Sequence, residues 1–141
     1  MTDASAGGDG PHRLLVGVDG SDTSWRAVYY ALGRARRENS TVIAVNVMPV
    51  AVAGVGAGCA ALVDAGSEMG TQIESLAREY DVDARFESVI GDPAGALLRL
   101  ASEYQADGIV VGASKALVHK IFGSIASRAV RRSPCPVTVV P

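Results

Sequence analysis

The sequence has few of the residues that mark specialised classes of protein. It contains only two cysteines, Cys59 and Cys135, and they form no CxxC pair. A disulfide framework is therefore excluded, and we expect two unpaired thiols. Together with only two histidines and scattered carboxylates, these cysteines show no metal-ligand spacing. The sequence thus predicts no metal centre.

The sequence also lacks an excess of basic residues and long apolar runs, which limits the classes of partner that it can have. Lys and Arg number 13 against 15 Asp and Glu, a net charge of -2, which lacks the basic excess of a nucleic-acid binder. No stretch approaches the roughly 20 apolar residues of a membrane helix. The first ten residues are small, polar and mildly acidic, without the basic start and apolar middle of a signal peptide. We therefore expect a cytoplasmic protein with a disordered tail over 1–11 and one domain over 12–141.

What the sequence does have is an alternation of apolar runs and helical patterns. The chain has 141 residues, 48% of them hydrophobic, which suits a single domain with a sizeable core. Short runs that are apolar throughout predict strands buried on both faces of a parallel sheet. The first such run is 13–18, and further strands are expected at 41–48, 84–90, 108–112 and 136–140. Helices are expected after Ser21, at about 60–79, from Pro93, and at 123–132.

Local signals mark where two of these helices begin. Asp22, Thr23 or Ser24 is expected to cap the first, and Asp92 to cap the third, with Pro93 at its first position. In the first helix, an apolar face is predicted at the helical spacing of Trp25, Val28, Tyr29 and Leu32.

The strand-helix alternation predicts an α/β fold, a doubly wound parallel sheet with helices on both faces. Ligands of such sheets bind beyond the carboxyl ends of the strands, where the winding reverses. The pattern alone does not give the strand order. With the order 3-2-1-4-5, the first and fourth strands flank that point, and their ends carry Asp19 and Gly112.

The first candidate site is the segment Gly17-Val18-Asp19-Gly20-Ser21. A carboxylate at a strand end, followed by glycine, can accept a hydrogen bond from a ribose hydroxyl or a base amine. Capping of the next helix by Asp19 explains the same residue equally well.

The second candidate is Gly112-Ala113-Ser114-Lys115, followed by seven residues and then Gly123-Ser124. Small residues bring backbone N–H groups close to an anion, and a helix beginning at Gly123 points further N–H groups at it. The segment is not a Walker A sequence. A flexible turn with a solvated lysine is the alternative.

A third glycine motif is a weaker candidate. Residues 56–61 match the dinucleotide fingerprint G-x-G-x-x-A, but Pro49 ends the preceding strand before them. We interpret 50–58 instead as a mobile flap beside the site. Catalytic groups are scarce. His12 lies near the tail, and His119, which could approach a bound phosphate, has no evident partner to orient it for base catalysis.

Five segments together resemble the universal stress protein family. They are LLVGVDGS (14–21), VIAVNVMP (42–49), GDPAGALL (91–98), ADGIVVGAS (106–114) and FGSIASRAVRRSPCPVTVVP (122–141). The resemblance runs from about Arg13 to Pro141. It implies a five-stranded parallel sheet of order 3-2-1-4-5.

The resemblance also implies a ligand, ATP or another adenine nucleotide, with or without Mg²⁺. Asp19 would hold the adenosine, with Gly17, Val18 and the Val47 backbone nearby. The phosphates would meet the second candidate segment, namely Gly112, Ala113, Ser114, Lys115, Gly123 and Ser124. The family motif is G-x2-G-x9-G-[ST]. This chain departs from it, with Lys115 at the second glycine and a spacer of seven residues.

Family members are commonly dimers joined along the last strand, here Pro136–Val140. An edge strand with unpaired backbone groups invites such pairing. Three functions follow as hypotheses: a stress-response sensor or regulator that binds an adenine nucleotide, a dimeric interaction protein with a degenerate phosphate loop and a protein partner, and, ranked last, a slow ATPase.

Overall fold

The structure is a computed structural model that describes residues 12–48, 56–113 and 131–141. Strands and helices alternate along most of this chain. In chain order they are β1 (Arg13–Gly17), α1 (Asp22–Glu38), β2 (Thr41–Met48), α2 (Gly56–Tyr80), β3 (Ala84–Ile90), α3 (Pro93–Glu103), β4 (Gly108–Gly112) and β5 (Val137–Val140). Of the predicted helix at 123–132, all but the last two residues lie outside the described residues.

The strands form one five-stranded sheet in the order β3-β2-β1-β4-β5. Every neighbouring pair is parallel. This confirms the predicted α/β class and the order that the resemblance implied. The winding reverses between β1, which pairs with β2, and β4, which comes much later in the chain.

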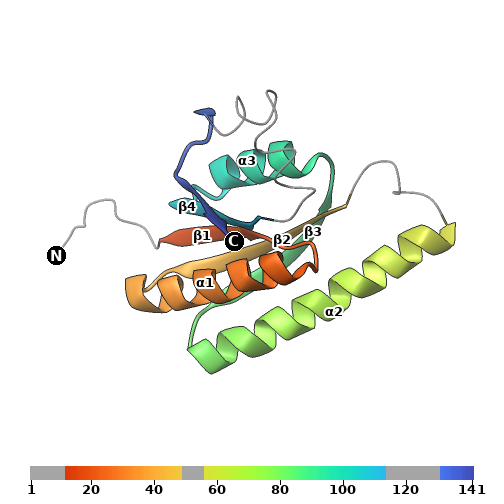
Figure 1. The fold of residues 1–141 in the computed structure, drawn as a ribbon, viewed down its shortest axis with the longest axis horizontal. Helices are drawn as coiled ribbons and strands as arrows, with labels where there is room; N and C mark the ends of the chain where they lie inside the picture. Colours follow the sequence, from red (N-terminus) through yellow and green to blue (C-terminus); the bar gives the residue numbers. More distant parts are fainter. Residues whose placement is uncertain (1–11, 49–55, 114–130) are drawn as a thin grey trace.

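Helices cover both faces of the sheet. Figure 1 shows α1 and α2 on one side and α3 on the other. Two apolar cores result because side chains alternate along each strand. The first core joins Leu14, Val16 and Val42 to α1 and α2. The second joins Leu15 and Ile43 to α3. Burial on both faces explains why the central strands β1, β2 and β4 are mostly apolar.

Two features of α1 differ from the sequence prediction. Its N-cap is Ser21, whose side chain accepts a hydrogen bond from the Ser24 amide. The predicted caps, Asp22, Thr23 and Ser24, instead lie within the helix. Tyr29 is 46% exposed, although the helical spacing placed it on the apolar face. Its ring packs beside Tyr80 of α2, with centroids 6.4 Å apart, so it lies at the margin between the two helices.

Helix α2 begins at Gly56, four residues before the expected start, and continues through Gly66 and Gly70. These two glycines let α2 approach the sheet closely. A Cβ on Gly70 would lie 2.8 Å from the Phe86 ring, and one on Gly66 would lie 3.1 Å from the Ser88 hydroxyl. Packing against β3 therefore outweighs the low helix propensity of glycine.

The start of α3 follows the sequence prediction. Asp92 is the N-cap and accepts a hydrogen bond from the Gly95 amide at 3.0 Å, and Pro93 occupies the first turn. Near β5, Cys135 is a free thiol. Burial raises the pKa of this thiol above its ordinary value. Within the described ranges, no helix has both the length and the apolar character needed to cross a membrane.

Candidate functional site

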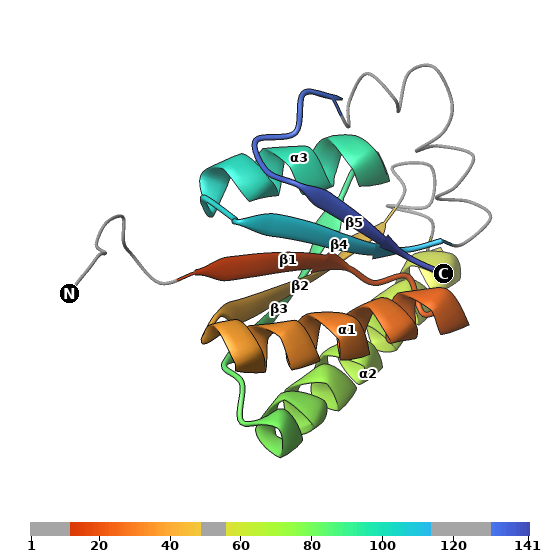
Figure 2. The same cartoon turned by 60° about the vertical axis from the view of Figure 1, so that its left-hand side comes forward.

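The two candidate segments meet at the carboxyl edge of the sheet. Gly17 is paired with Val45 of β2, and Val16 with Val110 of β4. Continuing these registers along the parallel strands puts Asp19 level with Val47 on one side. It puts Gly112 level with Val18 on the other. Figure 2 shows this edge, with the start of α1 near the end of β4.

Asp19 lies in the short loop between β1 and α1, and its carboxylate takes part in the loop's own hydrogen bonds. Its Oδ1 accepts a hydrogen bond from the Ser21 amide at 2.9 Å. Gly20 between them has φ +86°, a left-handed conformation that favours glycine. Asp19 itself is exposed. The loop therefore holds a carboxylate at the edge of the sheet in a defined orientation.

Gly112 ends β4 in contact with the backbone of α1. A Cβ on Gly112 would lie 2.4 Å from the carbonyl carbon and oxygen of Thr23 and 2.6 Å from the Ser24 nitrogen. No side chain fits there, because the obstructing atoms are backbone. Gly112 is thus required for close packing of β4 on the first turn of α1.

The other predicted site residues divide into two groups. Val18 is buried, and its amide donates to the Val45 carbonyl at 2.8 Å, which extends the β1–β2 ladder toward the edge. Ala113 follows β4, and its amide donates to the Val140 carbonyl at 2.8 Å. Ser114, Lys115, Gly123 and Ser124 lie outside the described residues. The structure thus brings one half of the predicted site together, around Asp19 and Gly112.

Two electrostatic features lie together at this edge. The N-terminus of α1 supplies a partial positive charge at this edge, and Asp19 supplies hydrogen-bond acceptors. His12 lies at the opposite, amino edge of the sheet, 3.4 Å from Asp107. Over the part of the chain that is described, no cluster of three metal-ligating side chains occurs.

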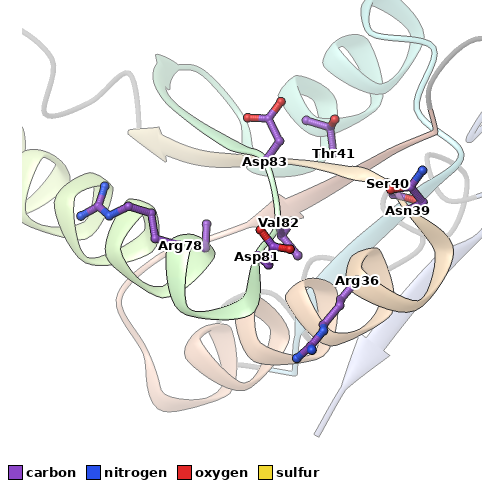
Figure 3. A pocket seen from close by; sticks show the side chains of 9 residues that line it. Arg36, Asn39, Ser40, Thr41, Arg78, Asp81, Val82 and Asp83 are labelled. Atoms are coloured by element: carbon purple, nitrogen blue, oxygen red, sulfur yellow. The ribbon is translucent and has the colours of Figure 1, made fainter.

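A pocket that the sequence did not indicate opens at the amino edge. It has a volume of about 500 Å³ and lies where α1 and α2 end and β2 and β3 begin (Figure 3). Its charged lining residues are Arg36, Arg78, Asp81 and Asp83. None of the residues predicted to bind a ligand lines it. It is separate from the candidate site, at the other end of α1.

One buried polar residue of the candidate site was also missed. Ser24 is 3% exposed and hydrogen-bonds both to Asp19 and to Ser21. The sequence presented it only as a possible cap. No local pattern marked it as buried, because the turn that carries it packs against Gly112 of the distant strand β4.

Comparisons with a family model, with related sequences and with solved structures all identify the same family. The family model described as "Universal stress protein family" matches residues 11–141. A universal stress protein of Methanocaldococcus jannaschii is 30% identical over 137 residues, which cover 91% of this chain and 81% of the relative.

Solved structures agree. A universal stress protein crystallised in complex with cAMP superposes with a TM-score of 0.70 at 28% identity, covering 92% of this chain and 97% of the other. A protein of the same family from Burkholderia pseudomallei gives a TM-score of 0.70 at 29% identity, covering 92% and 95%.

Proposed function

The chain belongs to the universal stress protein family, and on that premise we propose that it binds an adenine nucleotide at the carboxyl ends of β1 and β4. The observation that carries this proposal is that Asp19 and Gly112 follow or end two adjacent strands, β1 and β4, at the point where the sheet's winding reverses. Open α/β sheets bind ligands at such a point. A relative with 28% identity was solved in complex with cAMP, which supports the choice of ligand.

In the proposed complex, Asp19 accepts hydrogen bonds from the ribose hydroxyls. Gly17 and Val18 lie beside the adenosine, and the Val47 backbone approaches the base. The phosphates bind the segment after β4, through Gly112, Ala113, Ser114, Lys115, Gly123 and Ser124. The ammonium group of Lys115 supplies charge at the position where the family motif has its second glycine. The ligand is ATP or a related nucleotide, with or without Mg²⁺, and the protein acts as a sensor or regulator.

The proposal is tested by replacing Asp19 with alanine. Removing the carboxylate takes away hydrogen bonds to a charged acceptor, each of which contributes about 1.5–3 kcal/mol. We therefore expect the Kd for the nucleotide to rise by about 10- to 100-fold, since each 1.4 kcal/mol is about tenfold. Calorimetric titration with ATP and magnesium, then AMP and cAMP, measures this change.

The matched control is Asp83→Ala, which removes an exposed carboxylate at the amino edge of the sheet. Its Kd should equal that of the wild type, so a loss shared by both variants would point to net charge instead of a site. A wild-type titration that stays flat at millimolar nucleotide would reject nucleotide binding. The alternative, an interaction protein with a degenerate phosphate loop, would then replace it.

We also propose a homodimer joined along β5. This strand is last in the sheet order, and Val137–Val140 supplies four β-branched residues that are all partly buried in the single chain. One edge of β5 pairs with β4, and the other edge offers backbone N–H and C=O groups for pairing with a second copy of the chain. Sedimentation equilibrium should give twice the 14.5 kDa chain mass. A single-chain mass at micromolar concentration would contradict the dimer.

A further inference from the structure

Ser24 lies at the centre of a closed set of hydrogen bonds around Asp19. Its hydroxyl accepts from the Asp19 amide at 3.3 Å and donates to the Ser21 carbonyl at 3.0 Å. Ser21 in turn donates its amide to the Asp19 carboxylate. Ser24 therefore contacts Asp19 directly and also holds the residue that orients the Asp19 carboxylate.

The same serine abuts the other half of the site. Its backbone nitrogen is among the atoms that a Cβ on Gly112 would meet, so β4 packs directly on this turn of α1. Ser24 is buried, whereas Asp19 is exposed. From its buried position, Ser24 thus holds the loop that carries Asp19, at the point where the end of β4 packs against the first turn of α1.

The hydroxyl of Ser24 has a role separate from helix capping. The cap of α1 is the bond from the Ser24 backbone amide to the Ser21 hydroxyl at 3.2 Å. Changing Ser24 to alanine keeps that bond and removes only the two bonds of the Ser24 hydroxyl. The substitution therefore separates positioning of Asp19 from formation of the helix.

We propose that Ser24 is the positioning residue of the nucleotide site, holding Asp19 in the orientation that accepts the ribose hydroxyls. The inference rests on the proposed nucleotide binding. Ser24 touches no ligand in this arrangement and acts through Asp19 and Ser21. Its loss loosens the loop, so the ligand must order the loop on binding, which weakens affinity.

The first measurement is a double-mutant cycle by calorimetry with ATP. Ser24→Ala should raise the wild-type Kd about three- to tenfold, in line with the net worth of a hydrogen bond. In an Asp19→Ala background the same change should raise the Kd less than about twofold, because residues that act through one another are not additive. An equal loss in both backgrounds would mean general weakening of the structure and would overturn the proposal.

The second measurement needs no nucleotide. Amide hydrogen exchange at Asp19 reports the bond to the Ser24 hydroxyl, and its rate should rise about three- to tenfold in Ser24→Ala, while the rates within α1 stay at wild-type values. Unchanged exchange at Asp19 would overturn the proposal. If the wild type binds no nucleotide, the proposed function fails by itself, and the exchange rate alone decides whether Ser24 holds Asp19.

Ser40→Ala is the matched control for both measurements. Ser40 is a serine 7% exposed at the far end of α1, and its hydroxyl has no hydrogen-bond partner among the described residues. This variant removes the same atom from a comparably buried place without breaking a bond. Affinity and Asp19 exchange should both match the wild type, and a change in either as large as that in Ser24→Ala would overturn the proposal.

Discussion

Gly112→Ala is expected to lower the free energy of unfolding by about 1–3 kcal/mol, the usual cost of forcing extra atoms into a packed interior. The added Cβ would lie 2.4 Å from the carbonyl group of Thr23, and backbone atoms cannot rotate away. Either β4 or the first turn of α1 must shift. Because that turn carries the bonds to Asp19, nucleotide affinity should fall as well. Urea denaturation and calorimetric titration measure the two effects.

The matched control is Gly33→Ala, the same substitution on α1. A Cβ on Gly33 would meet only the end of the flexible Arg37 side chain, at 3.5 Å. Alanine favours the helix there, and stability should rise by about 0.5–1 kcal/mol. If Gly112→Ala and Gly33→Ala changed stability with the same sign, close contact between β4 and α1 would not be the reason for glycine at 112.

Leu15→Ala is expected to destabilise the protein still more, by about 2–5 kcal/mol, the range for removing a fully buried leucine side chain. Leu15 is completely buried in β1, the middle strand of the sheet, and belongs to the core beneath α3. Its neighbours come from several elements, so they cannot collapse together into the cavity. Urea denaturation measures the change, which should appear as a lower midpoint at constant slope.

Leu98→Ala provides the comparison on the same core. Leu98 lies on α3 and packs against this cluster while remaining only partly buried. Truncating Leu98 removes less buried apolar area, and water can occupy the space that the side chain leaves. The decrease in the free energy of unfolding should therefore be clearly smaller than for Leu15→Ala. Equal losses at the two positions would contradict the assignment of Leu15 to the centre of the core.

Elements with a strong local signal were predicted well. Asp92 and Pro93 specify the start of α3 by themselves, since cap and first-turn chemistry are local. Helix α2 was predicted to begin about four residues too late, because the glycine-rich segment 50–58 was interpreted as a flap, whereas Gly56 already belongs to the helix. Within the helix, Gly70 accommodates the Phe86 ring of β3, a contact that no local rule predicts. Tyr29 was assigned to the buried face because periodicity cannot show where one helix's contact with the sheet ends.

The candidate site was predicted less completely, and the reason is topological. Asp19 and Gly112 each stand out in the sequence, but only the strand order makes them neighbours. That order came from the family resemblance, not from the pattern. Ser24 was missed because its burial depends on β4, which no local rule connects to α1. The roles of Ser114, Lys115, Gly123 and Ser124 remain predictions.

The strand order also affects how the protein folds. β1 is made first, yet it lies in the middle of the sheet and must wait for β4 before both of its edges are paired. The hydrogen bond that the Arg13 backbone amide donates to the Asp107 carboxylate joins residues 94 positions apart in the sequence. Closing so long a loop costs entropy before native contacts compensate, and contacts of this kind slow folding. The β1–α1–β2 unit can form early, with the Asp19 loop already in it. The edge of the sheet at Gly112 is completed late, because it needs β4 to pair with β1. The protein should therefore become able to bind the nucleotide only in the last steps of folding.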